Sequence, residues 1–422
     1  MTASQRSSKP TRFGGAMIIA GTAIGAGMLA NPTATSGVWF IGSVLLLLYV
    51  WFCMYTSGLM LLEATLHFPQ GASFHTVVNA LLGPRWNLIT GVAVAFVLYS
   101  LTYAYIFVGG GLTQNTLVAA SGWLFEQPLQ PSRQLSSVVF LLVLATSVWI
   151  STKVVDRFAT LLIGGMLTSF FLSVGALLPT VTPSVLLNLN VQEQQTYWPY
   201  LWTALPVCLA SFGYHGNVPS LVSYYNKQAQ PVARSVLWGS LLALGIYVLW
   251  QLAVQGNLPR AEFAPVIAAD GDVAVLLQAL SAYTRTDTIA GLLSAFAYMA
   301  IASSFLGVTL GLFDYLRDVF NFSDTASGRF KTALLTFMPP LLACLVFPTG
   351  FVKVMGYVGL MAAIWAVLVP ALLVRSSRKR FAQADYQVFG GTTMIAFIVV
   401  FAVAAFVAQV LLLLQLLPIF KG

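Results

Sequence analysis

Long apolar stretches alternate with short polar segments along the whole chain. Eleven of these stretches have about 18 or more residues, which is the length that an α-helix needs to cross a bilayer. They cover residues 13–34, 38–63, 87–115, 136–152, 157–180, 199–222, 235–256, 288–314, 332–348, 351–374 and 391–417. The pattern predicts an all-α polytopic membrane protein with eleven transmembrane helices.

Two of these stretches are interrupted in the middle. The first contains GTAIGAGM at residues 21–28, and the sixth contains SFGYHGNVPS at residues 211–220. Each glycine inside a helix costs about 1 kcal/mol relative to alanine, and a backbone group freed inside a membrane needs another partner. We therefore expect discontinuous helices whose unwound segments line a polar cavity. The alternative role for the glycines is close helix packing.

The two interruptions lie five stretches apart, which predicts two halves of five helices. Because five is odd, the halves have opposite orientations and form an inverted repeat. We assign residues 1–12 to a cytoplasmic N-terminal tail, 13–180 to the first repeat, 199–374 to the second and 391–417 to the eleventh helix. This arrangement puts 15 of the 20 Lys and Arg residues on the N-terminal side of the membrane. The positive-inside rule then predicts a cytoplasmic N-terminus and a periplasmic C-terminus.

Composition agrees with a membrane protein and narrows the chemistry. The chain is 58% hydrophobic and 8% charged, with a mean hydropathy of +0.85, which is far from soluble proteins. The net charge of +8 comes from basic residues at the ends of apolar stretches, so it indicates lipid headgroups and no nucleic-acid partner. Three single cysteines offer neither a disulfide framework nor a CxxC metal site. With no HExxH pattern and no acidic pair within a stretch, we expect no enzyme activity.

Several motifs resemble those of the bacterial hydroxy/aromatic amino acid permeases, and the similarity runs almost end to end. It rests on both interruptions and on SSFLGVTLGLFDYL at residues 303–316. Four further motifs are more similar to the tryptophan-specific members: WFCM at 51–54, SGLM at 57–60, AFVLY at 95–99 and LTYAYI at 101–106. The resemblance implies the LeuT-like fold of the amino acid/polyamine/organocation superfamily. It also implies a bacterial inner-membrane location and uptake driven by an ion gradient.

One position departs from that family. A lysine is usual in the middle of the fifth span, whereas the matching stretch LIGGML at residues 162–167 has Met166. In proton-coupled relatives of this fold, such a lysine can occupy the volume where sodium-coupled relatives bind sodium. The resemblance therefore leaves H⁺ and Na⁺ as the two candidate coupling ions, with no other cofactor.

A zwitterionic amino acid needs donors for its carboxylate, acceptors for its ammonium group and an apolar pocket. The N–H groups of Gly25, Ala26 and Gly27 begin the second half of the first helix and suit the carboxylate. The carbonyl groups that end the preceding half-helices suit the ammonium group. They belong to residues 21–23, of which Ala23 is the last, and to Phe212 and Gly213.

Aromatic and hydroxyl side chains near the interruptions are candidates for holding the substrate ring, because rings stack and oxygens accept from an indole N–H. The candidates are Tyr99, Thr102, Tyr103, Phe212, Tyr214 and Phe305. Tyr99 and Tyr103 share one helix face at i and i+4. The alternative is ordinary packing, since 13% of the chain is aromatic.

His215 lies inside the second interruption. An ionisable residue within a membrane indicates a function, and imidazole titrates near neutral pH. We expect His215 either to carry a coupled proton or to bind the substrate. The alternative is a neutral histidine that bonds backbone groups freed by the break.

Ser303 and Ser304 fall midway along the eighth span. Their hydroxyl groups, with the carbonyls of Gly21, Ile24 and Ala300, would offer about five oxygen atoms, which suits sodium. Similarity to sodium-coupled members of the fold points the same way. The alternative is that both serines bond backbone groups of their own or a neighbouring helix.

Glu63 and Asp314 end the second and eighth spans. Either could pair with Arg12 or Arg157 in an inner gate, and ordinary solvation of helix ends is the alternative. The sequence as a whole predicts a monomeric secondary active transporter that imports an aromatic amino acid, most similar to a tryptophan carrier. A tyrosine or phenylalanine permease and a transport-derived amino acid sensor remain as alternatives.

Overall fold

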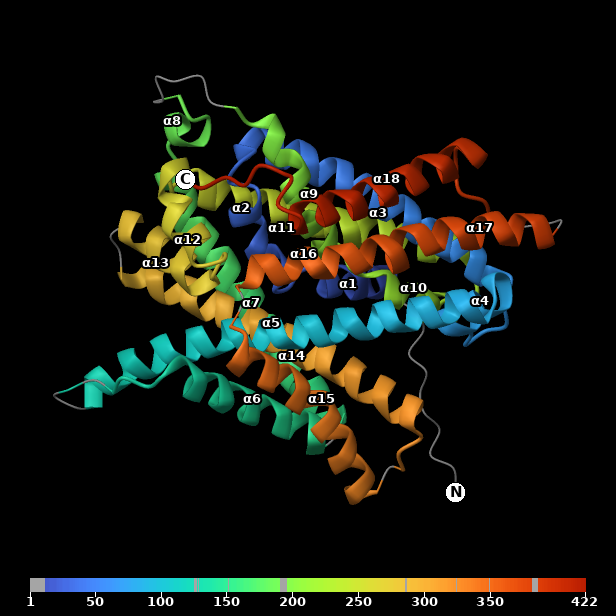
Figure 1. The fold of residues 1–422 in the computed structure, drawn as a ribbon, viewed down its shortest axis with the longest axis horizontal. Helices are drawn as coiled ribbons and strands as arrows, with labels where there is room; N and C mark the ends of the chain where they lie inside the picture. Colours follow the sequence, from blue (N-terminus) through green and yellow to red (C-terminus); the bar gives the residue numbers. More distant parts are fainter. Residues whose placement is uncertain are drawn as a thin grey trace.

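The computed structural model describes residues 12–124, 127, 129–150, 152–189, 196–284, 287–323, 325–348, 350–381 and 386–422. Within these residues every regular element is helical and no strand occurs. The expectation of an all-α protein is therefore confirmed (Figure 1). The predicted N-terminal tail lies outside the described residues, except for Arg12.

Helices of very different lengths follow one another along the chain. The first part of the chain forms α1 Arg12–Ala23, α2 Gly27–Ala34, α3 Trp39–Leu66, α4 Phe74–Leu82, α5 Pro84–Leu124, α6 Arg133–Ile150, α7 Thr152–Leu177 and α8 Pro183–Leu186. The second part forms α9 Leu201–Ser211, α10 Val218–Tyr224, α11 Ala229–Gln255, α12 Ala264–Ala268, α13 Val273–Thr284, α14 Asp287–Phe320, α15 Ala326–Val346, α16 Phe351–Ala362, α17 Val369–Arg380 and α18 Gly391–Leu413. Short 3₁₀ turns lie at Leu178–Thr180, Trp198–Tyr200, His215–Asn217 and Arg260–Phe263. A π-helical segment, Ala363–Leu368, joins α16 to α17.

Eight helices in the described part of the chain are long and apolar enough to cross a membrane. The pair α1 and α2, bent by 50° at its junction, would make a ninth. Each of the eleven predicted stretches falls on a helix or a broken helix. The fourth and sixth stretches, on α6 and on α9 with α10, are not among the spans counted above. The protein is thus a polytopic helical membrane protein.

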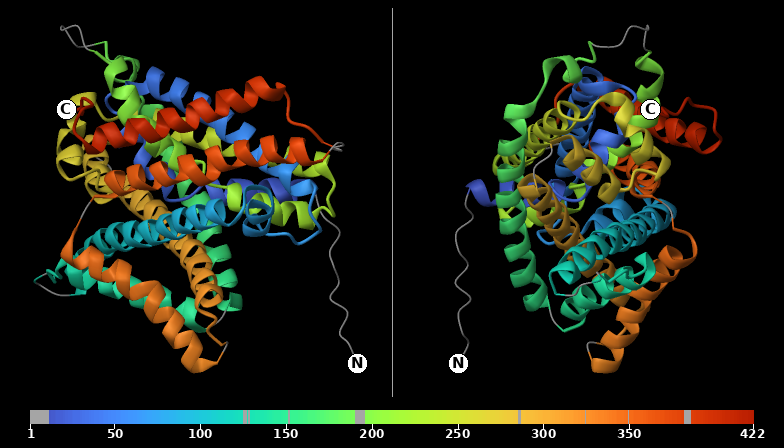
Figure 2. Two further views of the ribbon diagram at one scale, coloured as in Figure 1. Left: turned by 45° about the vertical axis from the view of Figure 1, so that its right-hand side comes forward. Right: turned by 90° about the vertical axis from the view of Figure 1, so that its left-hand side faces the viewer.

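The helices form two groups. α6 and α15 lie on one side of the molecule and α3, α17 and α18 on the other, with α5 and α16 between them (Figure 1, Figure 2). α1 packs along α11, α2 packs against α9, and α7 packs along α14. Packing between the first and second parts of the chain therefore brings the two predicted interruptions together.

Both predicted interruptions are confirmed as breaks in helices. The hydrogen bonds of α1 end with the Ile24 N–H donating to the Ala20 carbonyl at 2.6 Å, and the Met28 N–H then donates to the Gly25 carbonyl in a tighter turn. In the second break, α9 ends at Ser211 and α10 begins at residue 218. A proline at residue 219 fits there, because the first turn of a helix needs no N–H donor.

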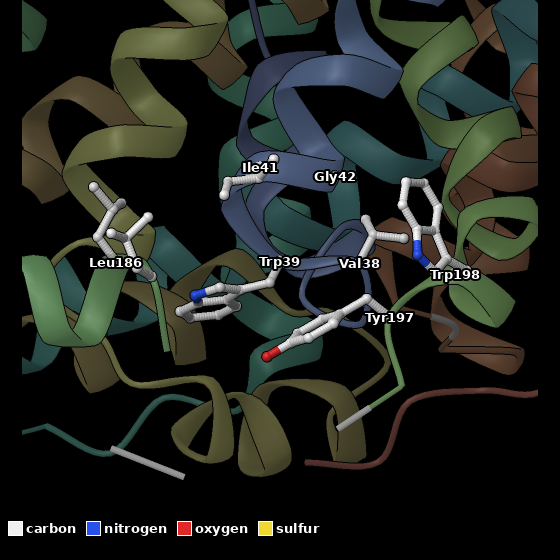
Figure 3. A pocket seen from close by; sticks show the side chains of 8 residues that line it. Val38, Trp39, Ile41, Gly42, Leu186, Tyr197 and Trp198 are labelled. Atoms are coloured by element: carbon white, nitrogen blue, oxygen red, sulfur yellow. The ribbon is translucent and has the colours of Figure 1, made fainter. Parts of the chain in front are cut away.

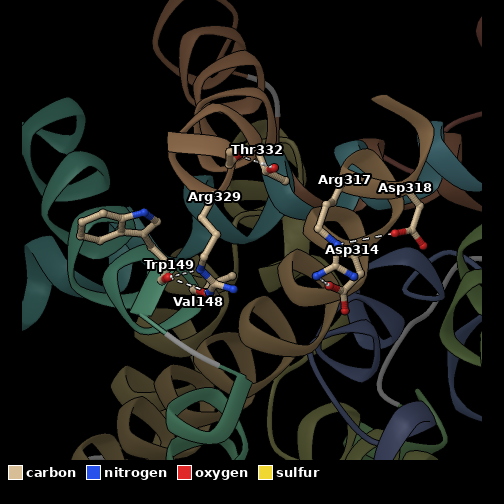
Figure 4. Close-up of polar contacts among 8 residues, drawn as sticks. Val148, Trp149, Asp314, Arg317, Asp318, Arg329 and Thr332 are labelled. Carbon is tan, nitrogen blue, oxygen red and sulfur yellow. Dashed lines mark hydrogen bonds and ion pairs between the residues drawn. The ribbon is translucent and has the colours of Figure 1, made fainter. Parts of the chain in front are cut away.

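Charged side chains make contacts within and between helices at one end of the bundle. Glu63 pairs with Arg378 of α17 at 2.6 Å, whereas the sequence suggested Arg12 or Arg157 as its partner. Asp314 pairs with Arg317 of its own helix at 3.2 Å (Figure 4). Figure 4 also shows the Arg329 side chain of α15 donating to the last carbonyls of α6, where a cation suits the helix dipole.

A buried arginine joins several segments at the opposite end of the bundle. Arg260 donates to the Ser36 carbonyl at 3.1 Å and to the Gly37 carbonyl at 2.7 Å, in the turn between α2 and α3. Its guanidinium lies 4.1 Å from the centre of the Phe420 ring, near the C-terminus. Burial lowers the pKa of Arg260, and two nearby tyrosines oppose this shift. The turn, the 3₁₀ segment of Arg260 and the C-terminal residues therefore form one packed cap.

Candidate functional site

The two breaks meet at one tyrosine hydroxyl. The Oη atom of Tyr247, on α11, lies 2.6 Å from the carbonyl oxygen of Ala23 and 2.5 Å from that of Ser211. Ala23 is the last residue of α1 and Ser211 is the last residue of α9. The C-terminal ends of both half-helices therefore converge on Tyr247.

The start of α2 faces α14 across Ser304. The N–H of Ala26 donates to the Ser304 Oγ atom at 3.0 Å. A Cβ atom at Gly25 would lie 2.5 Å from the same oxygen, so a side chain at residue 25 would displace the Ser304 hydroxyl that bonds to Ala26. Gly27 lies against Ser211, whose hydroxyl is 3.2 Å from the Gly27 carbonyl. The predicted carboxylate donors are thus together at the break, with Ala26 bonded to a serine oxygen.

The two predicted serines have different partners. Ser304 contacts the first break, whereas the Ser303 hydroxyl donates to the Ala300 carbonyl of its own helix at 3.2 Å. Ile24 is buried, and Gly21 is exposed. A Cβ atom at Gly21 would meet no described atom within 4 Å, so the backbone there borders open space.

Aromatic rings surround the second break. Phe212 is fully buried, and its ring centre lies 4.9 Å from that of Tyr247. The Tyr214 hydroxyl donates to the Met54 carbonyl at 3.1 Å, and its ring stacks on His215 at 4.8 Å. Gly213, between the two rings, is exposed.

Two further buried rings lie near Ser304. Phe305 packs between Phe140 and Phe337, with ring centres 5.5 and 6.1 Å away. Tyr105 of α5 is 5% exposed and its hydroxyl faces Ser304. The Tyr105 ring of α5 therefore adjoins the oxygen that meets the first break, and the Phe305 ring packs against rings of α6 and α15.

The other candidates of α5 bond to neighbouring backbone. Tyr99 donates to the Leu335 carbonyl of α15 at 2.9 Å, and Tyr103 donates to the Phe347 carbonyl, just after α15, at 2.6 Å. Thr102 donates to a carbonyl of its own helix at 2.8 Å. The shared face of Tyr99 and Tyr103 thus joins α5 to α15.

His215 has one bonded nitrogen and one without a partner. Its Nε2 atom lies 2.7 Å from the Ser57 hydroxyl, which also lies 3.0 Å from the Met54 carbonyl. If Ser57 donates its only proton to that carbonyl, Nε2 must carry a proton and Nδ1 is a bare acceptor. Among the described residues, Nδ1 has no hydrogen-bond partner although His215 is fully buried.

Trp365 is the nearest ring to His215 on another helix segment. Their ring centres are 6.2 Å apart, and within the described chain the indole N–H of Trp365 also has no hydrogen-bond partner. Trp365 belongs to the π-helical segment between α16 and α17. Such segments occur often at functional sites, because the extra residue shifts the side chains of one turn.

α11 has a buried polar face that was not predicted from the sequence. Tyr247, Gln251 and Gln255 follow each other at intervals of four and are all fully buried. Gln251 donates to the Thr35 hydroxyl at 2.5 Å and Gln255 donates to the Pro32 carbonyl at 3.2 Å. Three polar residues at helical spacing inside an apolar stretch were the signal that could have identified this face.

Two surface pockets lie away from the helix breaks. A pocket of about 230 Å³ opens beside the start of α3, where Trp39, Tyr197 and Trp198 line it (Figure 3). The Trp39 indole N–H donates to the Val185 carbonyl there at 3.2 Å. A wider pocket of about 980 Å³ lies between α5, α13 and α14. None of the residues that line these two pockets belongs to a helix break.

Two helices that break within apolar stretches, and whose carbonyl ends converge, are the arrangement of a membrane transport protein. The model of the tryptophan/tyrosine permease family matches residues 8–409. The chain belongs to this family and is therefore a transporter, not an enzyme.

Curated relatives align over nearly the whole chain. The chain is 60% identical to a tryptophan-specific transport protein of Haemophilus influenzae, over 95% of this chain and 96% of that protein. It is 49% identical to a tryptophan-specific transport protein of Pseudomonas aeruginosa, over 98% of each chain. It is also 39% identical to a tyrosine permease of Enterobacter agglomerans, again over 98% of each.

Proposed function

We propose that this chain is a secondary active transporter that imports L-tryptophan across the bacterial inner membrane by ion-coupled symport. The observation that carries the substrate assignment is the 60% identity to a tryptophan-specific transport protein along 95% of this chain. The tyrosine permease, at 39%, is less similar.

The proposed architecture has eleven spans, with the N-terminus in the cytoplasm and the C-terminus in the periplasm. Residues 13–180 and 199–374 form the two inverted repeats, and residues 391–417 form the last helix of a monomer. Two breaks, one in each proposed repeat, favour this division.

The proposed binding site for the carboxylate and ammonium groups of the substrate lies between the breaks. Its carboxylate takes the N–H groups of Gly25, Ala26 and Gly27. The bond from the Ala26 N–H to the Ser304 oxygen favours this. The same N–H would form a stronger hydrogen bond with a charged carboxylate than with a neutral hydroxyl. The ammonium group takes the carbonyls at Ala23, Phe212 and Gly213.

The proposed pocket for the indole ring uses the buried rings beside the breaks. Phe212 and Tyr214 approach from the second break, and Phe305 lies next to Ser304 in α14. Tyr99, Thr102 and Tyr103 act in this proposal as the wall of α5 that holds α15.

The proposed coupling ion is the proton, carried by His215. The buried Nδ1 atom without a partner in the described chain supports this, because in the tautomer with the proton on Nε2 it is an acceptor with its lone pair free. Sodium is the second candidate. Ser304 lies at the first break and Met166 leaves the fifth span without the lysine that the family resemblance implies.

Counterflow of labelled L-tryptophan in proteoliposomes tests the function. The expected result is rapid exchange that unlabelled tryptophan inhibits more strongly than tyrosine or phenylalanine. Imposing pH and sodium gradients separately tests the ion, and we expect an inward proton gradient to drive accumulation. Exchange that prefers tyrosine would make tyrosine the substrate, and accumulation driven by sodium alone would make sodium the coupling ion. Binding without exchange would favour a sensor.

A further inference from the structure

Tyr247 contacts the ends of both broken helices at once. It is fully buried on α11, and its hydroxyl touches the terminal carbonyls of α1 and α9 at 2.6 and 2.5 Å. The C-terminal end of a helix carries a partial charge of about −0.5. Two such ends, whose last carbonyl oxygens are held within reach of one atom, repel each other unless something positive lies between them.

The hydroxyl proton of Tyr247 supplies a partial positive charge between the two ends, but Tyr247 has only one such proton. A phenol donates a single hydrogen bond, so at any moment either the Ala23 or the Ser211 carbonyl has no proton from Tyr247. The carbonyl left over is a strong acceptor in a buried setting, where an unpaired polar group is costly. A substrate ammonium group, with three donors, satisfies this acceptor.

The rest of α11 holds this arrangement rigid. Gln251 and Gln255 lie on the same helix face as Tyr247 and bond to Thr35 and Pro32. α11 therefore contacts the first broken helix both before and after its break. The Phe212 ring, 4.9 Å from that of Tyr247, fixes the second break against the same tyrosine.

We propose that Tyr247 is the positioning residue for the ammonium group of the substrate. Its hydroxyl keeps the carbonyl ends of α1 and α9 together and leaves one carbonyl free for the ammonium group. Selection of an α-amino acid over the same molecule without its amine therefore depends on Tyr247. This inference rests on the proposed function.

The test is Tyr247→Phe, which keeps the ring against Phe212 and removes only the hydroxyl. Binding of L-tryptophan and of indole-3-propionate, which has the ring and carboxylate but no amine, is measured on the purified protein. We expect the affinity for tryptophan to fall about tenfold or more and that for indole-3-propionate to stay within about twofold. The preference for the amine, the ratio of the two affinities, then falls with it.

Tyr315→Phe is the matched control. Tyr315 donates to the Gly91 carbonyl at 3.2 Å, so this variant also removes one hydroxyl-to-carbonyl bond between helices, away from the breaks. We expect it to bind both ligands as the wild type does. Melting temperatures of both variants report any general loss of stability.

The outcomes separate this inference from the proposed function. If the wild type binds no tryptophan, the proposed function fails. If the wild type binds tryptophan and Tyr247→Phe keeps its preference for the amine, only the role of Tyr247 is refuted. An equal loss of both ligands would likewise refute it, because that is what a merely structural bond predicts.

Discussion

The carboxylate of Glu63 accepts two hydrogen bonds from the guanidinium of Arg378, at 2.6 and 2.8 Å. It also accepts one from the Val388 N–H at 2.7 Å. Glu63 is fully buried and Arg378 is 22% exposed. One carboxylate therefore joins α3, α17 and the segment before α18.

Replacing Glu63 should destabilise the protein. Glu63→Ala leaves Arg378 and the Val388 N–H without their acceptor, and breaking a buried ion pair costs about 3 kcal/mol or more. We expect the melting temperature in detergent to fall by several degrees. Asp314→Ala is the control, because the pair of Asp314 and Arg317 is partly exposed and contributes little. An unchanged melting temperature for Glu63→Ala would contradict the assigned role.

A side chain at residue 25 should displace the Ser304 hydroxyl from its bond with the Ala26 N–H. In Gly25→Ala the new Cβ atom meets the Ser304 Oγ atom at 2.5 Å, so we expect most of the tryptophan uptake to be lost. In the double variant Gly25→Ala/Ser304→Ala the nearest remaining atom is the Cβ of residue 304, at 3.8 Å. Uptake by the double variant should therefore exceed that of Gly25→Ala.

Gly245→Ala is the control for this pair. Gly245 lies in α11, and no described atom would lie within 4 Å of a Cβ there. Alanine also favours a helix by about 1 kcal/mol over glycine. We expect normal uptake and an equal or higher melting temperature. If the double variant were no better than Gly25→Ala alone, the clash would not be the cause.

Replacing His215 should abolish proton-driven uptake of tryptophan and leave exchange intact. His215→Gln removes the acceptor Nδ1 and cannot carry a proton, so a pH gradient should no longer drive accumulation of tryptophan. Counterflow, which needs no net proton movement, should persist. Ser57→Ala should weaken the coupling only in part, because it removes the partner of Nε2 and keeps the imidazole. Full accumulation by His215→Gln under a pH gradient would rule out His215 as the proton carrier.

Arg260 should hold the packed cap at the opposite end of the bundle. A lysine in its place lacks the planar, forked guanidinium that donates to both carbonyls while it lies on the Phe420 ring. Arg260→Lys should cost about 1–3 kcal/mol and lower the melting temperature. Lys421→Ala, at an exposed residue of the same segment, should not. Equal melting temperatures for these two variants would count against the cap.

The sequence alone was sufficient for the helices, the breaks and the family. Apolar runs must be long enough to span a bilayer, and glycine interrupts a helix through its own backbone, so both features are local. The breaks after Ala23 and Ser211 are where the glycine-rich motifs predicted them. The resemblance to aromatic amino acid permeases is likewise carried by short motifs and agrees with the family match.

Tertiary packing decided which side chains meet. Neighbouring residues on a helix point about 100° apart, so the sequence could not tell that Ser304 reaches the break while Ser303 bonds its own helix. Nor could it pair Glu63 with Arg378, which lies 315 residues further along the chain. Tyr247 was overlooked for the same reason. Its hydroxyl gains significance only because folding brings two helix ends, distant in sequence, to within hydrogen-bonding distance of one atom.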